Sequence, residues 1–181
     1  MAFNIKDVNH ITSEEMKIII TDYYKKRNYI LVGTELRIRI NRGYYFCDAF
    51  ACNLDEFIEF EIKTSKKDLY SDIKTKEKKH SLYLSKNIKN PHAPNKFYFV
   101  VTEELYRDFN IRKHIENISP NYGIICIKFW AEDCWQIDIC KSAKPLHNNE
   151  VKEELIKNIY KKLSAENISL RKSLYTAKHN L

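Results

Sequence analysis

The chain has 181 residues, of which 44% are apolar; this is enough to bury one sizeable core, and we expect a single domain over residues 1–181. Three glycines and four prolines are too few for a turn-rich all-β protein, or for a glycine-rich loop that cradles a nucleotide phosphate. The net charge is +7, no apolar run approaches the roughly 18 to 20 residues that cross a bilayer, and residues 1–8 lack the apolar stretch of a signal peptide, so we expect a cytoplasmic protein.

The first third of the chain predicts one helix followed by three strands. Thr12 and Glu15 have the spacing of a capping box, and apolar residues then recur at helical spacing until about Lys26. Alternating apolar residues predict three strands, over 29–40, 44–52 and 57–64. The connector 53–56 is polar and of hairpin length, so the strands on either side of it should pair antiparallel.

The rest of the chain predicts alternating helices and strands. Residues 65–84 carry spaced apolar residues among lysines, as in an amphipathic helix that is either continuous or interrupted. Residues 103–118 predict a short helix plus a loop, and a helical extension is expected from about residue 148, with fraying from about Ser173. Further strands are expected over 96–102, 123–129 and 134–140. We therefore expect an α/β fold in which helices flank a mixed central β-sheet.

An acid and a base share one face of the third predicted strand. The period-2 rule puts Glu59, Glu61 and Lys63 on one face and the apolar residues between them on the other. A metal ligand and a neighbouring lysine would need to point the same way, as Glu61 and Lys63 do. A Glu-x-Lys pair alone is weak evidence, because it is common in a chain rich in both residues and usually marks a solvated strand face.

The hairpin geometry adds a second carboxylate. Asp48 and Glu61 are equidistant from the centre of the connector, so a symmetric hairpin places them directly across from each other, where like charges are destabilising. A cation would relieve that repulsion, and two carboxylates plus a backbone carbonyl, that of Ile62, suit Mg²⁺ or Mn²⁺. A slip of one residue in the register would instead turn Asp48 to the opposite face.

All of the excess positive charge lies in one segment. Lys63 to Lys96 contains ten lysines and three acidic residues, so the remainder of the chain is neutral. Such a cluster can bind phosphate backbones through counterion release, or it can be a solvated basic helix face.

These residues occur within a longer ordered pattern. The pattern consists of Asp48, then Glu61-Ile62-Lys63, Thr64 to Leu69, Lys78-Lys79-His80, Pro94 to Val101, Tyr122 to Ile125 and Ala143 to His147. It resembles the MmcB-like DNA repair proteins of the PD-(D/E)xK nuclease superfamily over about residues 10–150. The predicted order of helix, three strands, helix and strand (αβββαβ) also matches that superfamily's core. The chain departs from the literal signature at Cys47, which stands where the motif's name has proline.

The resemblance implies a restriction-endonuclease-like core and metal-dependent cleavage of phosphodiester bonds in DNA, with Mg²⁺ or Mn²⁺ as cofactor. Asp48 and Glu61 would be catalytic metal ligands together with the Ile62 carbonyl, and Lys63 would orient or activate the attacking water. Glu35 stands where many members carry an additional acid, although a glutamate at a strand end is also commonly solvated.

The resemblance also implies contacts with nucleic acid from the basic segment. The residues expected to make them are Lys66, Lys67, Lys74, Lys78, Lys79 and His80. Each lysine has solvation at the surface as its alternative role, and His80 could equally be a packed histidine that caps the helix.

Two other functions stay open at this point. One is a catalytically silent DNA-binding module that assists repair, and the other is a nuclease that acts on RNA. A repair role and a role in phage or mobile-element DNA metabolism are both compatible with the same residues.

Overall fold

The computed structural model describes residues 11–40, 43–85, 88, 90–131 and 134–179, and the expectation for residues 1–8 therefore lies outside the described part. Six strands form one mixed sheet in the order β1-β2-β3-β4-β5-β6. The strands are β1 (Leu31–Ile40), β2 (Gly43–Cys52), β3 (Phe57–Lys63), β4 (Lys96–Thr102), β5 (Gly123–Ala131) and β6 (Cys134–Lys141). The central pairs β3–β4 and β4–β5 are parallel and the other three pairs are antiparallel. The expected α/β class with a mixed sheet is confirmed.

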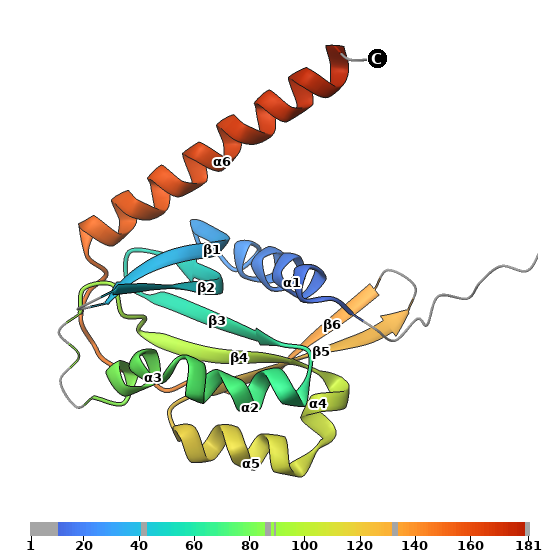
Figure 1. Cartoon of the computed structure of the whole chain (residues 1–181), viewed down its shortest axis with the longest axis vertical. Helices are drawn as coiled ribbons and strands as arrows, with labels where there is room; N and C mark the ends of the chain where they lie inside the picture. Colours follow the sequence, from blue (N-terminus) through green and yellow to red (C-terminus); the bar gives the residue numbers. More distant parts are fainter. Residues whose placement is uncertain (1–10, 41–42, 86–87, 89, 132–133, 180–181) are drawn as a thin grey trace, which may run out of the picture.

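Helices cover both faces of the sheet (Figure 1). They are α1 (Ser13–Lys25), α2 (Lys66–Thr75), α3 (Glu77–Tyr83), α4 (Glu103–Arg107), α5 (Phe109–Ile118) and α6 (Glu153–His179). One face packs against α1, and the opposite face packs against α2 to α5 through residues such as Leu69, Leu105 and Ile111. Leu155 and Ile159 of α6, with Ile156 and Leu163 beside them, pack against β1, β2 and the start of β3, and α6 beyond Leu163 runs away from the body. No helix among the described residues has both the length and the apolar character needed to span a membrane.

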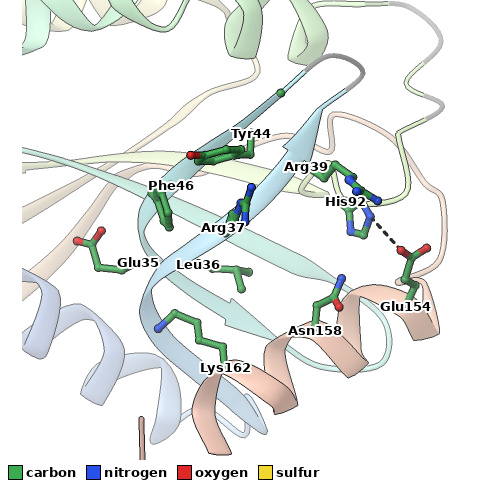
Figure 2. Close-up of a pocket in the computed structure, with 11 residues that line it drawn as sticks. Glu35, Leu36, Arg37, Arg39, Tyr44, Phe46, His92, Glu154, Asn158 and Lys162 are labelled. Carbon is green, nitrogen blue, oxygen red and sulfur yellow. Dashed lines mark ion pairs between the residues drawn. The ribbon is translucent and has the colours of Figure 1, made fainter. Parts of the chain in front are cut away.

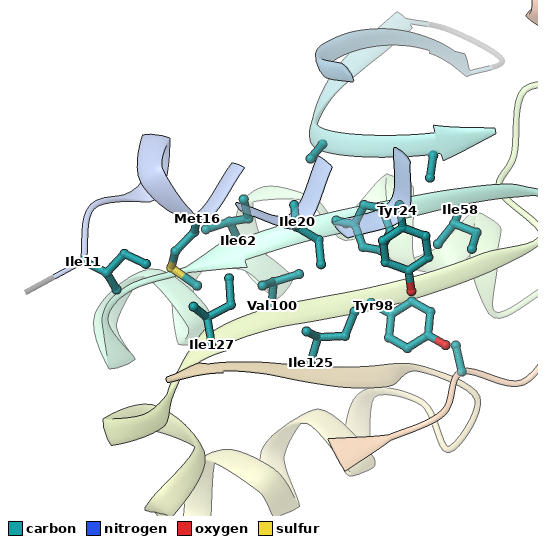
Figure 3. Close-up of a cluster of buried hydrophobic side chains, with 14 residues drawn as sticks. Ile11, Met16, Ile20, Tyr24, Ile58, Ile62, Tyr98, Val100, Ile125 and Ile127 are labelled. Atoms are coloured by element: carbon teal, nitrogen blue, oxygen red, sulfur yellow. The ribbon is translucent and has the colours of Figure 1, made fainter. Parts of the chain in front are cut away.

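The core beneath α1 follows from the capping and periodicity seen in the sequence. Thr12 accepts a hydrogen bond from the Glu15 amide while the Glu15 carboxylate accepts one from the Thr12 amide, which is the predicted capping box. Met16 and Ile20 are fully buried on the sheet-facing side of this helix, as Figure 3 shows. Their burial fixes α1 over β3 and leaves the opposite face of β3 to the helices that follow it.

Two details differ from the sequence-based expectation, and a third decides between alternatives that the sequence left open. Residues 103–118 form two helices rather than a helix and a loop, because Asp108 ends α4 and also caps α5 by accepting from the Asn110 amide. The C-terminal helix begins at Glu153 rather than near 148, and it continues beyond Ser173 to His179. The segment 65–84 is interrupted, and the break falls at Lys76, whose φ of −113° and ψ of 28° lie outside the helical region.

The β2–β3 hairpin has the predicted register. Its four pairs run from Cys52↔Phe57 to Ala49↔Phe60, so the same register continued by one residue sets Asp48 opposite Glu61. On the other side of β2, Asp48 falls opposite Glu35, between the pairs Thr34↔Ala49 and Leu36↔Cys47. Glu35 has a positive φ of 53°, which locally disturbs the strand beside Asp48.

Candidate functional site

A buried charge cluster lies between β3 and the helices α2 and α3. It contains three carboxylates and three lysines: Glu59, Glu61 and Asp72, and Lys63, Lys76 and Lys79. The strand contributes its members because alternate residues of β3 point to one face. The helices contribute theirs because Asp72, Lys76 and Lys79 recur at helical spacings of four and three, although the helix is broken between them.

Glu61 is the centre of this charge cluster and is completely buried. Its Oε1 lies 2.9 Å from Lys63 Nζ and also pairs with Lys76, while its Oε2 lies 2.5 Å from Lys79 Nζ. Burial opposes the negative charge, but the three ammonium groups outweigh burial and hold the pKa of this carboxyl below its ordinary value. Glu61 is therefore ionised throughout the neutral range.

Lys63 is held between two acids. Its Nζ lies 2.9 Å from Glu61 Oε1 and 2.9 Å from Asp72 Oδ1. Burial favours the neutral amine, but these two carboxylates raise the pKa of Lys63 above its ordinary value. The side chain is thus a fixed, protonated donor rather than a base.

Asp72 joins α2 to the same network. His80 Nε2 lies 2.8 Å from its Oδ2, and Tyr122 Oη lies 3.0 Å from His80 Nδ1. Burial opposes its charge, but His80 and the surrounding lysines hold the pKa of Asp72 well below its usual range. Its Oδ1 is buried and lacks a hydrogen bond of favourable direction, even though two ammonium groups lie 2.9 and 3.3 Å away. One acceptor in the cluster is therefore left incompletely satisfied.

Glu59 has a different environment from Glu61. Its Oε2 accepts hydrogen bonds from the hydroxyls of Tyr83 at 2.6 Å and Tyr45 at 2.9 Å, and its Oε1 lies 3.2 Å from Lys79. Burial raises its pKa to about 7, with Lys79 opposing that rise. Lys79 Nζ lies closer to Glu61 than to Glu59. Its attraction therefore does not offset the effect of burial, and Glu59 is protonated at mildly acidic pH.

Asp48 lies at the edge of the charge cluster and is only partly buried. Its Oδ2 accepts a hydrogen bond of 2.7 Å from the Ile62 amide, which ties β2 to β3 beyond the last regular pair of the ladder. Burial and the nearby charge of Glu61 raise the pKa of Asp48 to about 6. The two carboxylates are therefore close enough to repel each other, as the hairpin register predicts.

The residues around Asp48 fit a divalent cation in part. In an antiparallel pair the N–H and C=O of one residue point to the same neighbouring strand, so the Ile62 carbonyl faces β2 as its amide does. Asp48, Glu61 and this carbonyl are oxygen donors of the kind that Mg²⁺ accepts, with water completing the shell. Among the described residues, no group of three or more His, Cys, Asp and Glu side chains could hold a metal ion. Any cation would therefore rest on these two carboxylates and would compete with the lysines on Glu61.

Access to Glu61 is limited. Glu61, Lys63 and Lys79 are 0 to 3% exposed, whereas the Lys76 side chain is 25% exposed. Asp48, at the edge of the charge cluster, and Lys76, within it, are the residues beside Glu61 that reach solvent. A ligand that approaches Glu61 therefore meets these two side chains first.

Glu35 lies apart from these charges. Its side chain is half exposed and its carboxylate pairs with Lys17 of α1. The register sets its backbone opposite Asp48, but the side chain turns toward α1. The structure does not bring the Glu35 carboxylate to Glu61, where the resemblance would place an additional acid.

The residues expected to contact nucleic acid divide into two groups. Four lysines are exposed on α2 and α3, and one of them, Lys66, pairs with Asp108. The exposed four are Lys66, Lys67, Lys74 and Lys78. Lys79 and His80 are instead 1% and 3% exposed, and their polar atoms face Glu61, Asp72 and Tyr122. The expectation that Lys79 and His80 meet phosphate at the surface does not fit this burial, because α3 turns both side chains toward the sheet.

Two members of the charge cluster were not expected from the sequence. Asp72 and Lys76 resemble any charged pair on the solvated face of a helix, and their i, i+4 spacing is common. The sequence hinted at them only through a possible interruption of segment 65–84. The break falls at Lys76, whose side chain pairs with Glu61.

Comparisons with known proteins add information on the fold alone. No family model matches the chain, and no curated protein matches it. A solved structure described as the SPO1766 protein of unknown function from Silicibacter pomeroyi is similar to it, with a TM-score of 0.53 and 14% sequence identity over 88% of each chain. At this identity, the similarity indicates a shared α/β architecture.

Proposed function

We propose that this protein is a metal-dependent endonuclease of the PD-(D/E)xK type, which hydrolyses phosphodiester bonds in DNA with Mg²⁺ or Mn²⁺. The observation that carries the proposal is the placement of Asp48 beside Glu61 with Lys63 fixed next to them. Two carboxylates and one fixed ammonium are what a hydrolytic metal site of this class requires.

The order of the elements supports a restriction-endonuclease-like core. Helix α1, strands β1 to β3, the α2–α3 pair and strand β4 follow one another as helix, three strands, helix and strand. The proposed site lies where β2 and β3 meet the helices that follow β3, just beyond the last regular pair of the β2–β3 ladder.

Each side chain has a defined task in the proposed reaction. Asp48, Glu61 and the Ile62 carbonyl would hold the cation, which when bound polarises the phosphate and lowers the pKa of a water molecule. Lys63 stays protonated, and the one N–H that Glu61 and Asp72 leave free would donate a hydrogen bond to the attacking water, while its charge would stabilise the charge that develops on the phosphate. Glu61 and Asp72 hold Lys63 in place, which removes the cost of ordering a flexible chain during the reaction.

The exposed lysines of α2 and α3 would position the DNA. Lys67, Lys74 and Lys78 are exposed and belong to the segment that carries the whole positive excess of the chain. Lysines of this kind contact phosphates without reading the base sequence, so they set affinity and orientation.

The test is a cleavage panel over single-stranded, duplex and branched DNA and over RNA, in Mg²⁺ or Mn²⁺. We choose Asp48→Ala as the main variant, because Asp48 is partly exposed and its loss leaves the buried lysines paired. Cleavage should fall by roughly two orders of magnitude or more. Asp55→Ala removes an exposed carboxylate from the β2–β3 connector and is the matched control, with unchanged activity expected. Full activity in a folded, metal-saturated Asp48→Ala protein would overturn the proposal.

A second candidate is a DNA-binding accessory module that does not cleave. It is favoured by the three ammonium groups on Glu61, which already neutralise the principal metal ligand. Binding that is unaffected by EDTA, with no nicking of any DNA form in Mg²⁺ or Mn²⁺, would support this candidate. Cleavage of RNA but not of DNA would instead identify an RNA-directed nuclease.

A further inference from the structure

The outer half of the β1–β2 hairpin carries a surface that the proposed cleavage site does not use. We call it the hairpin surface, and it consists of Arg37, Arg39, Tyr44 and Phe46. Arg37 pairs across the strands with Phe46, and Arg39 pairs with Tyr44, so cationic and aromatic side chains lie opposite each other. Figure 2 shows Arg37, Tyr44 and Phe46 close together, with Glu35 apart from them.

The two rings are unusually exposed for such large apolar groups. Tyr44 is 53% exposed and Phe46 is 47% exposed, and they contact each other edge to face at 5.6 Å. The other side of β1 is occupied by core residues, since Leu36 and Ile38 are 2% and 1% exposed. The exposed rings therefore add nothing to that core.

The charge on this surface is positive and available. The Arg37 guanidinium lies over the Tyr44 ring at 3.7 Å. Within the described part of the chain, neither Arg37 nor Arg39 forms an ion pair. Two acids line the adjoining groove as well: Glu35 pairs with Lys17, and Glu154 lies 3.8 Å from His92. An anionic partner would meet two guanidinium groups that form no ion pair within the described residues.

The hairpin surface also borders two hollows. A groove of about 600 Å³ separates it from α6, where Asn158 and Lys162 form the opposite wall. A second hollow of about 950 Å³ continues on the side of Asn90 and Pro91. Arg37, Arg39 and Tyr44 line both hollows, so a chain-like ligand could pass over the hairpin from one hollow to the other.

We infer that the hairpin surface binds single-stranded DNA, whose bases stack on the ring faces that Arg37 does not cover while the two guanidinium groups contact its phosphates. Exposed rings with neighbouring arginines are the combination that binds single strands, because unpaired bases offer a free face to an aromatic ring whereas duplex bases do not. This inference rests on the proposed function in one respect. Phe46 precedes Asp48 by two residues, about 7 Å along β2, so a DNA strand bound at the hairpin surface would lie near the proposed cleavage site.

The test measures the binding of a fluorescein-labelled 12-nucleotide oligo-dT by fluorescence anisotropy in EDTA, so that cleavage plays no part. Wild type should bind the single strand more tightly than a duplex of equal length. Tyr44→Ala combined with Phe46→Ala should weaken single-strand binding by roughly tenfold or more. Arg37→Ala combined with Arg39→Ala should lower the slope of log affinity against log salt by between about one and two.

Two controls separate stacking from general effects. Tyr160→Ala removes a ring on α6 that is 55% exposed and outside the hairpin surface, and it should leave binding unchanged. Phe46→Trp keeps an aromatic face at the same place and should bind at least as well as wild type. Equal binding by wild type and the Tyr44/Phe46 double variant, or a preference for oligo-U or duplex, would overturn the inference.

The outcome is independent of whether the protein cleaves. Ring-dependent binding without cleavage of any substrate would uphold the hairpin surface and refute the proposed hydrolysis. Cleavage that depends on Asp48, together with cleavage and binding that are unchanged in the Tyr44/Phe46 double variant, would uphold the proposed hydrolysis and refute the hairpin surface as a binding site.

Discussion

The charge cluster beneath α2 and α3 and the hairpin surface lie on neighbouring parts of the same sheet, yet they treat charge in opposite ways. In the charge cluster, each lysine faces carboxylates at short distance, and Lys63 and Lys79 are almost completely buried while Lys76 reaches solvent. On the hairpin surface, two guanidinium groups lie in solvent beside aromatic rings and without acidic partners among the described residues. The ion pairs of the charge cluster stabilise the fold, whereas the guanidinium groups of the hairpin surface are available to bind a ligand.

The largest effect should follow the loss of the central acid. Glu61→Ala would remove the counter-charge shared by Lys63, Lys76 and Lys79, of which Lys63 and Lys79 are buried, and breaking buried ion pairs is strongly destabilising. We expect a loss of about 3 to 5 kcal/mol in the free energy of unfolding, measured by urea denaturation. A loss below about 1 kcal/mol would show that the lysines reach water in solution, and the charge cluster would then not be closed.

The next effect concerns pH and Glu59. Its pKa is raised from an ordinary 4.5 to about 7, so between these pH values the native protein holds a proton that the unfolded chain has released. The proton on Glu59 therefore stabilises the native protein fully below pH 4.5, and this stabilisation is lost as the pH rises through 7. The total loss in the free energy of unfolding is about 3 kcal/mol.

Glu59→Gln removes this titration. The difference in unfolding free energy between wild type and Glu59→Gln should therefore shift in favour of the variant as the pH rises from 5 to 8. Glu56→Gln provides the comparison, since Glu56 lies just before β3, outside the charge cluster, and pairs with Lys96. Parallel stability curves for wild type and Glu59→Gln would contradict the buried, protonated state of Glu59.

A smaller effect should appear at the entrance to the charge cluster. Lys76 occupies Glu61 Oε1 and lies 3.3 Å from Asp72 Oδ1, so Lys76→Ala removes a positive charge that competes with a metal ion. If the proposed function is right, Mn²⁺ affinity measured by titration calorimetry should rise roughly tenfold, or about 1.4 kcal/mol. Lys74→Ala, which removes an exposed lysine near the end of α2, should leave the affinity unchanged, and weaker binding by Lys76→Ala would argue that Lys76 supports the site instead.

The sequence predicts the strand framework well because its signals there are local. Alternation along β3 places Glu61 and Lys63 on one face, and the length of the connector sets Asp48 opposite Glu61. Both predictions depend only on residues that are close along the chain, and the register agrees with them.

The sequence fails where a side chain's surroundings come from distant packing. Lys79 and His80 belong to a run of lysines that reads as a solvated basic face, but packing of α3 on the sheet buries both. Asp72 gives no sign that it will support Lys63, since that contact joins a helix to a strand. The Glu35 side chain points toward Lys17, and its backbone has a positive φ. A strand pattern without glycine does not predict a positive φ.

The smallest effect tests whether the hairpin surface is dispensable for folding. Phe46→Ala should reduce the unfolding free energy by only about 0.5 to 1 kcal/mol, since a half-exposed ring loses chiefly its contact with Tyr44. Phe50→Ala on the same strand is the matched core variant; it removes a fully buried ring and should reduce the unfolding free energy by about 3 to 5 kcal/mol. If the two substitutions proved equally destabilising, the Phe46 ring would be part of the core in solution, and a base could not reach its face.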